Sequence, residues 1–299
     1  MSKEQNNFSS FVIVGLGLIG GSIAKDLRTK YPGASIVSID SDKQSIDDAM
    51  QLGIVDKGID YADLPRFAQV VVLTPPVGQV IPCARRVFDS LNKSKNRAFE
   101  RCVVFDAASV KKPIAAEFKK LTAKSRGVEF LATHPMAGTE FSGFSHARKD
   151  LFRAKPWMVC RHSENSDEAV SGVCELLRGL GSRVVFIDPD EHDKSAAVVS
   201  HAVIILSNII FDYIASVHPE ALKLAGDGFT STTRIASGNP ELHKDIILHN
   251  SEYTDAVLKE FSHFLDDKIA NLSVSDAKLL QEYFTQNMNR RNEWIRRKE

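Results

Sequence analysis

The sequence has few cysteines, no excess of charge and no leading apolar segment. Four cysteines occur in 299 residues and none forms a C-x-x-C pair, so we expect neither a disulfide framework nor a metal site. Lys plus Arg and Asp plus Glu each number 38, which argues against the basic stripe of a nucleic-acid-binding protein. Residues 1–7 are polar, without the apolar core of a signal peptide. Together these absences favour a cytoplasmic protein with reduced cysteines.

The sequence also lacks an uninterrupted membrane-spanning run. Its longest apolar stretch covers residues 196–217, but His201, Asn208 and Asp212 interrupt it, and a charge at mid-bilayer is costly. We therefore expect a buried helix of a soluble protein and no membrane partner. Burying this helix against a second copy of itself is the simplest solution, which predicts a homodimer.

Three polar residues of that stretch share one helical face. The spacings of seven and four residues place His201, Asn208 and Asp212 within a narrow arc at 100° per residue. They form either an interhelical hydrogen-bond network or a polar seam that faces a cleft. We favour the network for Asn208 and Asp212, and we keep His201 as a candidate substrate-binding residue.

The most informative pattern that is present is a G-x-G-x-x-G motif after the apolar run 11–14. Gly15 allows a tight turn, Gly17 lets the backbone approach a pyrophosphate, and Gly20 lets the following helix pack against the sheet. Leu18 and Ile19 begin that helix, whose N-terminus supplies free N–H groups and a partial positive charge. These residues predict a dinucleotide site, whereas a βαβ unit without ligand is the plainer alternative.

A carboxylate follows at the spacing such a site needs. Asp40 ends the second apolar run, 35–39, about twenty residues after the motif, where it can accept both ribose hydroxyls of an adenosine. The same carboxylate would repel a 2′-phosphate. The pattern therefore favours NAD over NADP.

Short apolar runs then alternate with helical stretches as far as Ile187. This alternation predicts an α/β fold with a parallel, doubly wound, Rossmann-type sheet. Its predicted strands are Gln69–Leu73, Cys102–Phe105, Glu129–Ala132, Trp157–Cys160 and Arg183–Ile187; its predicted helices are Val77–Leu91, Pro113–Lys124 and Ser166–Leu180. From Asp188 the pattern is helical throughout. We expect a cofactor domain over residues 1–188 and an all-helical substrate and dimerisation domain over residues 189–299.

Three loops are expected to converge at the carboxyl ends of the strands. Thr74 and Pro75 follow the third strand and form either a rigid flank for the adenosine or an ordinary strand exit. Ser109 follows the next strand and serves as a helix N-cap or as a hydroxyl that orients substrate. His134 directly follows a further strand, and a histidine there can take a proton from an alcohol as the alcohol is oxidised.

One segment of the helical half carries a candidate anion site. Residues 226–240 hold hydroxyls, small side chains and a single arginine, Arg234, with few other charges. A guanidinium in this setting is suited to bidentate capture of a carboxylate. The alternative is an arginine that caps carbonyls at a helix end.

Three motifs together resemble the prephenate/arogenate dehydrogenase family of tyrosine biosynthesis. They are Gly15–Ser22, Thr133–Glu140 and Thr233–Pro240, and they occur in the family's order over nearly the whole chain. The resemblance implies NAD-dependent oxidative decarboxylation of prephenate to 4-hydroxyphenylpyruvate. It also implies that His134 is the base, that Ser109 orients the substrate hydroxyl and that Arg234 holds a substrate carboxylate. Thr139 and Glu140 are expected to line the entrance.

Other activities suit the same architecture. Arogenate dehydrogenase activity differs only in the substrate's side-chain amino group. A hydroxyacid dehydrogenase or imine reductase would rely on a helical-domain lysine, whereas the best candidate here is a strand-end histidine. A non-catalytic NAD-binding sensor would have no reason to place His134 beside a nicotinamide.

Overall fold

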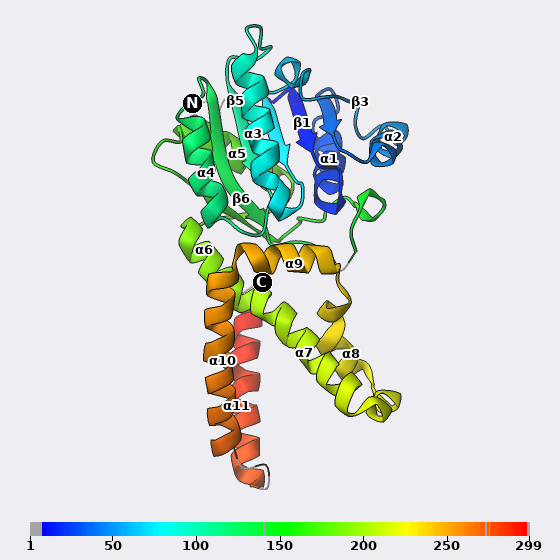
Figure 1. The fold of residues 1–299 in the computed structure, drawn as a ribbon, viewed down its shortest axis with the longest axis vertical. Coiled ribbons are helices and arrows are strands. Elements are labelled where there is room, and N and C mark those ends of the chain that lie inside the picture. The colour runs from blue at the N-terminus through cyan, green and yellow to red at the C-terminus, as the bar shows by residue number, and fades with distance from the viewer. Residues whose placement is uncertain (1–7, 140, 273, 275, 298–299) are drawn as a thin grey trace. The chain divides into compact units, whose positions relative to one another are not determined.

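An eight-stranded sheet forms the centre of the first part of the chain (Figure 1). Its strands follow the order β3-β2-β1-β4-β5-β6-β7-β8. Their bounds are β1 Ser10–Val14, β2 Ser35–Ile39, β3 Lys57–Gly58, β4 Val70–Leu73, β5 Cys102–Asp106, β6 Val128–Pro135, β7 Pro156–Cys160 and β8 Arg183–Phe186. This order, with the first strand in the middle and strands added outward on both sides, is that of a doubly wound fold.

The computed structural model describes residues 8–139, 141–272, 274 and 276–297. The chain divides into two units, the first ending at Ser251 and the second beginning at Glu252. The second unit holds nearly all of α10 (Ser251–Asn271) and all of α11 (Ala277–Arg296). The features of the candidate site all lie in the first unit.

Helices cover both faces of the sheet because its strands are apolar on both faces. Phe11 and Ile13 of β1 pack with α1 (Leu18–Lys30) and α5 (Asp167–Gly179). The intervening residues of β1, Val12 and Val14, pack with α3 (Val77–Lys93) and α4 (Lys112–Thr122). The α2 helix (Lys43–Gln51) adds Ala49 to the first layer. Burial on both faces explains the β-branched runs of the sequence.

The predicted strands and helices of this half are confirmed, with ends that differ by no more than three residues. Two features were not predicted. The two-residue strand β3 is too short to leave a pattern, and the 3-10 turn η1 (Leu64–Arg66) follows it. The four cysteines are free; Cys102, Cys160 and Cys174 are buried, and Cys83 is partly exposed.

The expectation of a wholly parallel sheet is wrong at one pair. β6 and β7 are antiparallel, with Ala132 opposite Cys160 and Pro135 opposite Trp157. A parallel return needs a crossover, usually a helix, but the described residues between these strands, 136–139 and 141–155, hold only the 3-10 turn η2 (Phe144–His146). The apolar run of β7 carries no mark of direction, so its sequence does not distinguish the two pairings.

A continuous helical stretch begins after the last strand. Asp188 caps α6 (Pro189–Ala196) by accepting from the N–H groups of Asp190 and Glu191, as the predicted helix start implies. A π-helical turn, η3 (Ala197–His201), leads into α7 (Ala202–Val217). This stretch, Pro189–Val217, is long and apolar enough to span a membrane by length and composition alone, which is weak evidence.

The single chain leaves much of this helix exposed, and its burial against a second copy stays a prediction. Only 28% of its most apolar window is buried, and Ile209, Phe211 and Tyr213 are exposed. Asn208 donates to the carbonyl of Ile204, and Asp212 accepts from Ser216. Among the described residues of the single chain, neither side chain forms the interhelical bond we favoured. Both side chains instead pair within their own helix.

The rest of the first unit returns to the sheet. The chain passes through η4 (Pro219–Leu224), α8 (Asp227–Thr233), η5 (Arg234–Ser237) and α9 (Pro240–His249). Ile246 of α9 packs in the same layer as Val77 and Val80 at the start of α3. A Cβ added at Gly78 would meet the His249 ring at 3.4 Å, so α9 lies directly against that helix.

Candidate active site

The glycine loop leaves open space at one position only. Gly15 has φ +98°, and a Cβ there would lie 2.8 Å from the carbonyl carbon of Thr74. A Cβ at Gly20 would lie 1.9 Å from the carbonyl oxygen of Gly15. A Cβ at Gly17 would meet no protein atom within 4 Å, and Gly17 is the N-cap of α1, without a side-chain cap. The loop thus exposes the N–H groups that open α1, including those of Leu18 and Ile19, to a ligand.

Two side chains hold this loop. Asp40, just after β2, accepts from the N–H of Leu16 at 2.5 Å and from that of Asp42 at 2.8 Å. The Thr74 hydroxyl lies 2.6 Å from the carbonyl oxygen of Gly15 and donates to it. Pro75 lies against Gly15. The structure therefore brings Asp40, Thr74 and Pro75 to the loop, and the Thr74 hydroxyl supports its tight turn.

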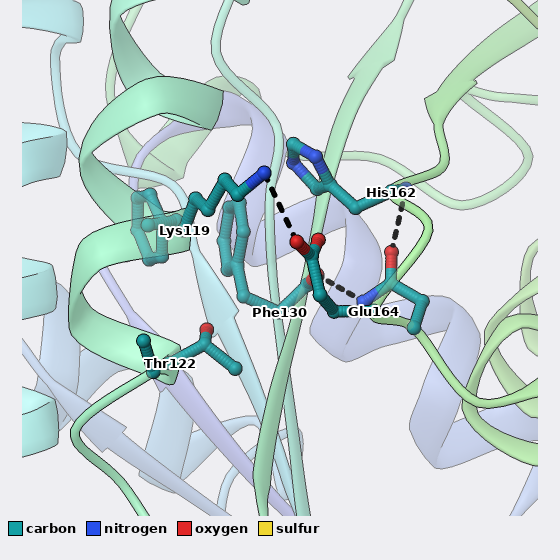
Figure 2. A pocket seen from close by; sticks show the side chains of 8 residues that line it. Lys119, Thr122, Phe130, His162 and Glu164 are labelled. Carbon is teal, nitrogen blue, oxygen red and sulfur yellow. Dashed lines mark hydrogen bonds and ion pairs between the residues drawn. The ribbon is translucent and has the colours of Figure 1, made fainter.

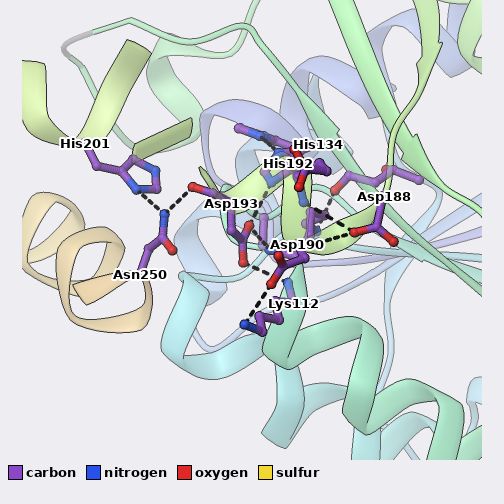
Figure 3. A network of polar contacts seen from close by, with 12 residues as sticks. Lys112, His134, Asp188, Asp190, His192, Asp193, His201 and Asn250 are labelled. Carbon is purple, nitrogen blue, oxygen red and sulfur yellow. Dashed lines mark hydrogen bonds and ion pairs between the residues drawn. The ribbon is translucent and has the colours of Figure 1, made fainter. Parts of the chain in front are cut away.

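His134 lies at the carboxyl end of β6 and contacts a second histidine (Figure 3). Its Nδ1 is 2.9 Å from Nε2 of His192, and Nδ1 of His192 is 2.8 Å from Oδ1 of Asp193. His192 and Asp193 are almost wholly buried. Burial lowers the pKa of His134 well below its ordinary value, and the nearby His192 lowers it further. His134 is therefore neutral at pH 7 and able to accept a proton.

Asp193 is held by the start of another helix. Its two carboxylate oxygens accept from the backbone N–H groups of Lys111 and Lys112 at 2.7 and 2.8 Å. These amides open α4, whose N-cap residue offers no side-chain cap of its own. A helix N-terminus favours negative charge, so this position stabilises the ionised carboxylate.

A buried ion pair supports the strand that carries His134. The Lys111 ammonium donates to Asp106 at the end of β5 and to the carbonyl of Thr133 at 2.7 Å. The Thr133 N–H donates to the Asp106 carboxylate at 2.9 Å, and the Thr133 hydroxyl accepts from the Trp157 indole at 2.9 Å. Burial raises the pKa of Asp106, and the neighbouring ammonium opposes that rise. The pair fixes the ends of β5 and β6 side by side.

His201 is linked to Asp193 through the side chain of Asn250 (Figure 3). The amide nitrogen of Asn250 lies 2.8 Å from the carbonyl oxygen of Asp193 and 2.9 Å from Nδ1 of His201. His201 is 1% exposed, and burial lowers its pKa from 6.5 to about 4. His201 sits in the π-helical turn, a deviation that often occurs at functional sites.

Ser109 lies between the end of β5 and the start of α4. Its Oγ is buried and has no hydrogen-bond partner among the described residues. Ser109 caps no helix, because the N-cap of α4 is Lys111. A buried hydroxyl without a partner calls for an explanation, and a substrate hydroxyl would supply the missing bond.

The remaining candidates lie on two loops that touch each other. Arg234 is exposed and begins η5, after which Asn239 donates to the Ser142 hydroxyl at 3.3 Å. Ser142 belongs to the loop that follows His134, so this contact joins the arginine segment to that loop. Thr139 accepts from the N–H of Phe141 at 3.2 Å. Glu140 lies outside the described residues.

Two family models match the chain in tandem. The prephenate dehydrogenase nucleotide-binding domain matches residues 23–186, and the prephenate dehydrogenase dimerization domain matches residues 188–286. The chain belongs to the prephenate dehydrogenase family.

Relatives agree with this assignment. Prephenate dehydrogenase of Bacillus subtilis is 30% identical over 92% of this chain and 73% of its own length. The structure of A. aeolicus prephenate dehydrogenase in complex with hydroxyphenyl propionate and NAD⁺ has a TM-score of 0.83 at 28% identity, and covers 97% of this chain and 99% of that one. Synechocystis arogenate dehydrogenase gives a TM-score of 0.77 at 26% identity, with coverage of 95% and 99%.

Sequence reasoning missed four residues of this family member's site. His192, Asp193, Lys111 and Asn250 were not predicted, although His192 and Asp193 lie just after the predicted helix start at Asp188. The backbone N–H of Lys111, the His192 ring and the Asn250 amide bond partners 49 to 82 residues away along the chain, which no local pattern reveals.

A separate pocket lies away from these residues (Figure 2). It measures about 250 Å³ and is lined by Phe118, Lys119, Thr122, Ala123, Phe130, His162, Glu164 and Asn165. None of the predicted site residues lines it. Its lysine pairs with its glutamate at 3.0 Å, so it offers no spare charge to a ligand.

Proposed function

We propose that this protein catalyses the NAD-dependent oxidative decarboxylation of prephenate to 4-hydroxyphenylpyruvate, a step of tyrosine biosynthesis. The observation that carries the proposal is the neutral His134, held at the carboxyl edge of a dinucleotide-binding sheet by His192 and Asp193. Ligands of doubly wound sheets bind at this edge. Membership of the prephenate dehydrogenase family supplies the substrate class.

The chemistry follows from what these side chains can hold. His134 accepts the hydrogen bond and then the proton of the ring hydroxyl as the C–H bond on the same carbon breaks. NAD⁺, when bound, supplies the two-electron oxidant. The bond to the ring carboxylate also breaks, and its electron pair completes the aromatic ring as CO₂ leaves. General-base help of this kind contributes roughly 10²–10⁴ in rate.

Two groups position the substrate in this proposal. The unpartnered hydroxyl of Ser109 bonds the same ring hydroxyl that His134 deprotonates. Arg234 holds a substrate carboxylate from the loop that Asn239 joins to the segment after His134. Thr139, Glu140 and His201 complete the substrate site.

The residues around the glycine loop suit NAD. The open space at Gly17 and the start of α1 admit a pyrophosphate, while Gly15 and Gly20 form the close contacts of the loop. Asp40 stands at the end of β2 where the ribose hydroxyls bind, and its charge disfavours a 2′-phosphate. Thr74 and Pro75 flank the adenosine.

The assembly we propose is a cytoplasmic homodimer, with a cofactor domain over residues 1–188 and a substrate and dimerisation domain over 189–299. The apolar residues of α7 that the single chain leaves exposed support this assembly, since large exposed apolar patches mark interfaces. The family model over residues 188–286 is that of a dimerization domain.

The direct test is reduced-cofactor absorbance with purified protein, crossing prephenate and arogenate with NAD⁺ and NADP⁺. We expect turnover with prephenate and NAD⁺. Turnover with arogenate alone would change the substrate and keep the reaction type. If folded protein that binds NAD⁺ shows no turnover in any of the four mixtures, the proposal is overturned in favour of another oxidoreductase or a sensor.

A further inference from the structure

We propose that Asp193 gives the two histidines of the site opposite hydrogen-bonding polarity: its carboxylate, acting through His192, leaves Nε2 of His134 an acceptor, and its carbonyl, acting through Asn250, leaves Nε2 of His201 a donor. His192 and Asn250 are thus positioning residues. The inference deepens the proposed function and rests on it for its chemical meaning.

The first chain of bonds starts at an ionised carboxylate. Asp193 accepts two backbone N–H groups at the start of α4, so it has no proton to give. Its contact with Nδ1 of His192, at 2.8 Å, therefore needs a proton on that nitrogen. The proposal assigns His192 a single ring proton, on Nδ1, so its Nε2 can only accept.

This polarity passes to His134. Nδ1 of His134 lies 2.9 Å from Nε2 of His192, so Nδ1 of His134 carries the shared proton. A neutral His134 is consequently bare at Nε2, the nitrogen on the far side of the ring. That nitrogen is the one able to accept a proton from a substrate hydroxyl.

The second chain starts at the carbonyl of the same residue. A backbone carbonyl only accepts, so the Asn250 atom 2.8 Å from it is the amide nitrogen. The same nitrogen lies 2.9 Å from Nδ1 of His201 and donates its other proton there. Nδ1 of His201 is then bare, and neutral His201 carries its proton on Nε2.

The two polarities are complementary to a substrate that is both deprotonated and bound as an anion. His134 takes a proton from a hydroxyl, whereas His201 donates a hydrogen bond to a carboxylate or carbonyl oxygen. Because both tautomers depend on Asp193, the base and the donor are set before substrate arrives, which avoids reorganisation during the reaction.

Nitrogen NMR of the full-length protein with ¹⁵N-labelled histidine tests this without substrate. Chemical shifts separate protonated from bare ring nitrogens, and spectra of H134N and H201N assign the two residues. We expect His134 protonated at Nδ1 only and His201 protonated at Nε2 only. Identical tautomers, or His134 protonated at Nε2, would overturn the inference.

Variants extend the test to turnover. H192L should leave the His134 tautomer unfixed and lower kcat by roughly 10- to 100-fold, the loss that follows when a metal-ligating histidine loses its orienting partner. H192Q should restore most of the rate, because its carbonyl oxygen can accept from His134 and its amide can donate to Asp193. H162Q, at a half-buried histidine outside this network, is the matched control. Equal kcat in H192L and wild type would contradict the relay.

Asn250 is tested by its closest isostere. N250D presents only acceptors, so His201 should move a proton to Nδ1, visible in the same spectrum. A His201 signal unchanged in folded N250D would overturn this arm, and the wild-type spectrum decides the question if N250D does not fold. An active enzyme with identical tautomers would overturn this inference alone, whereas predicted tautomers in an inactive protein would overturn the proposed function alone.

Discussion

The glycine loop and the histidine cluster lie at the same edge of one sheet, yet they are assembled over very different spans of sequence. The loop, its helix and Asp40 come from 31 consecutive residues, Ser10–Asp40, with Thr74 and Pro75 as the added support. The histidine cluster draws on Asp106, His134, Asp193, His201 and Asn250. A local site is readable from its pattern, whereas a distributed site depends on the whole fold.

The strongest way to break the distributed site is to remove its buried cation. K111M leaves the Asp106 carboxylate buried without its partner and should lower the free energy of unfolding by about 3–5 kcal/mol. Urea unfolding measures the loss. K112M is the matched control, since that side chain is half exposed. A loss no larger than that of the control would show that the pair does not hold β5 and β6 together.

Arg234 tests the substrate side of the comparison. R234Q should weaken substrate binding by about 1.5–3 kcal/mol, the usual worth of a hydrogen bond to a charged group, while NAD⁺ affinity stays constant. The ratio of kcat to KM for prephenate, with NAD⁺ affinity from fluorescence titration, separates these effects. R183Q, at an exposed arginine of β8, provides the control. An unchanged KM in R234Q would remove Arg234 from the site.

Acid should destabilise the cluster. The pKa of His201 is 6.5 when unfolded and about 4 when folded, so its contribution is fully present above pH 6.5 and is lost as pH falls through 4. The expected loss is about 3 kcal/mol. Unfolding of wild type and H201Q at pH 7 and pH 4 would measure it. Both proteins losing the same stability would contradict the assignment to His201.

The local site makes the smallest prediction and the cleanest contrast. G20A should lower the unfolding free energy by about 1–3 kcal/mol, since its Cβ would overlap the Gly15 carbonyl. G17A should change the unfolding free energy by less than about 0.5 kcal/mol, because its Cβ meets no protein atom within 4 Å. It should weaken NAD⁺ binding, because that Cβ enters the space proposed for the pyrophosphate. Thermal unfolding and NAD⁺ titration of both variants check this. Equal NAD⁺ affinity in G17A and wild type would argue against a pyrophosphate at that position.

The same contrast explains what the sequence could predict. Helix α1 begins at Leu18, as predicted, because a strand, a glycine loop and a helical run follow one another directly. The antiparallel β7 was not, because its direction is decided by the absence of a crossover helix before it. His134 was found as a strand-end histidine, but His192 was not, because its partner is 58 residues away. The apolar pattern of α7 predicts burial against a second copy of the chain, and the single chain leaves that face exposed.

The central claim is that His134 is the base of an NAD-dependent dehydrogenase. The most direct measurement is kcat of H134N with prephenate and NAD⁺ both saturating, together with NAD⁺ affinity measured by titration. We predict that kcat falls by roughly 10²–10⁴ while NAD⁺ affinity stays at the wild-type value. Full turnover by H134N would contradict the account.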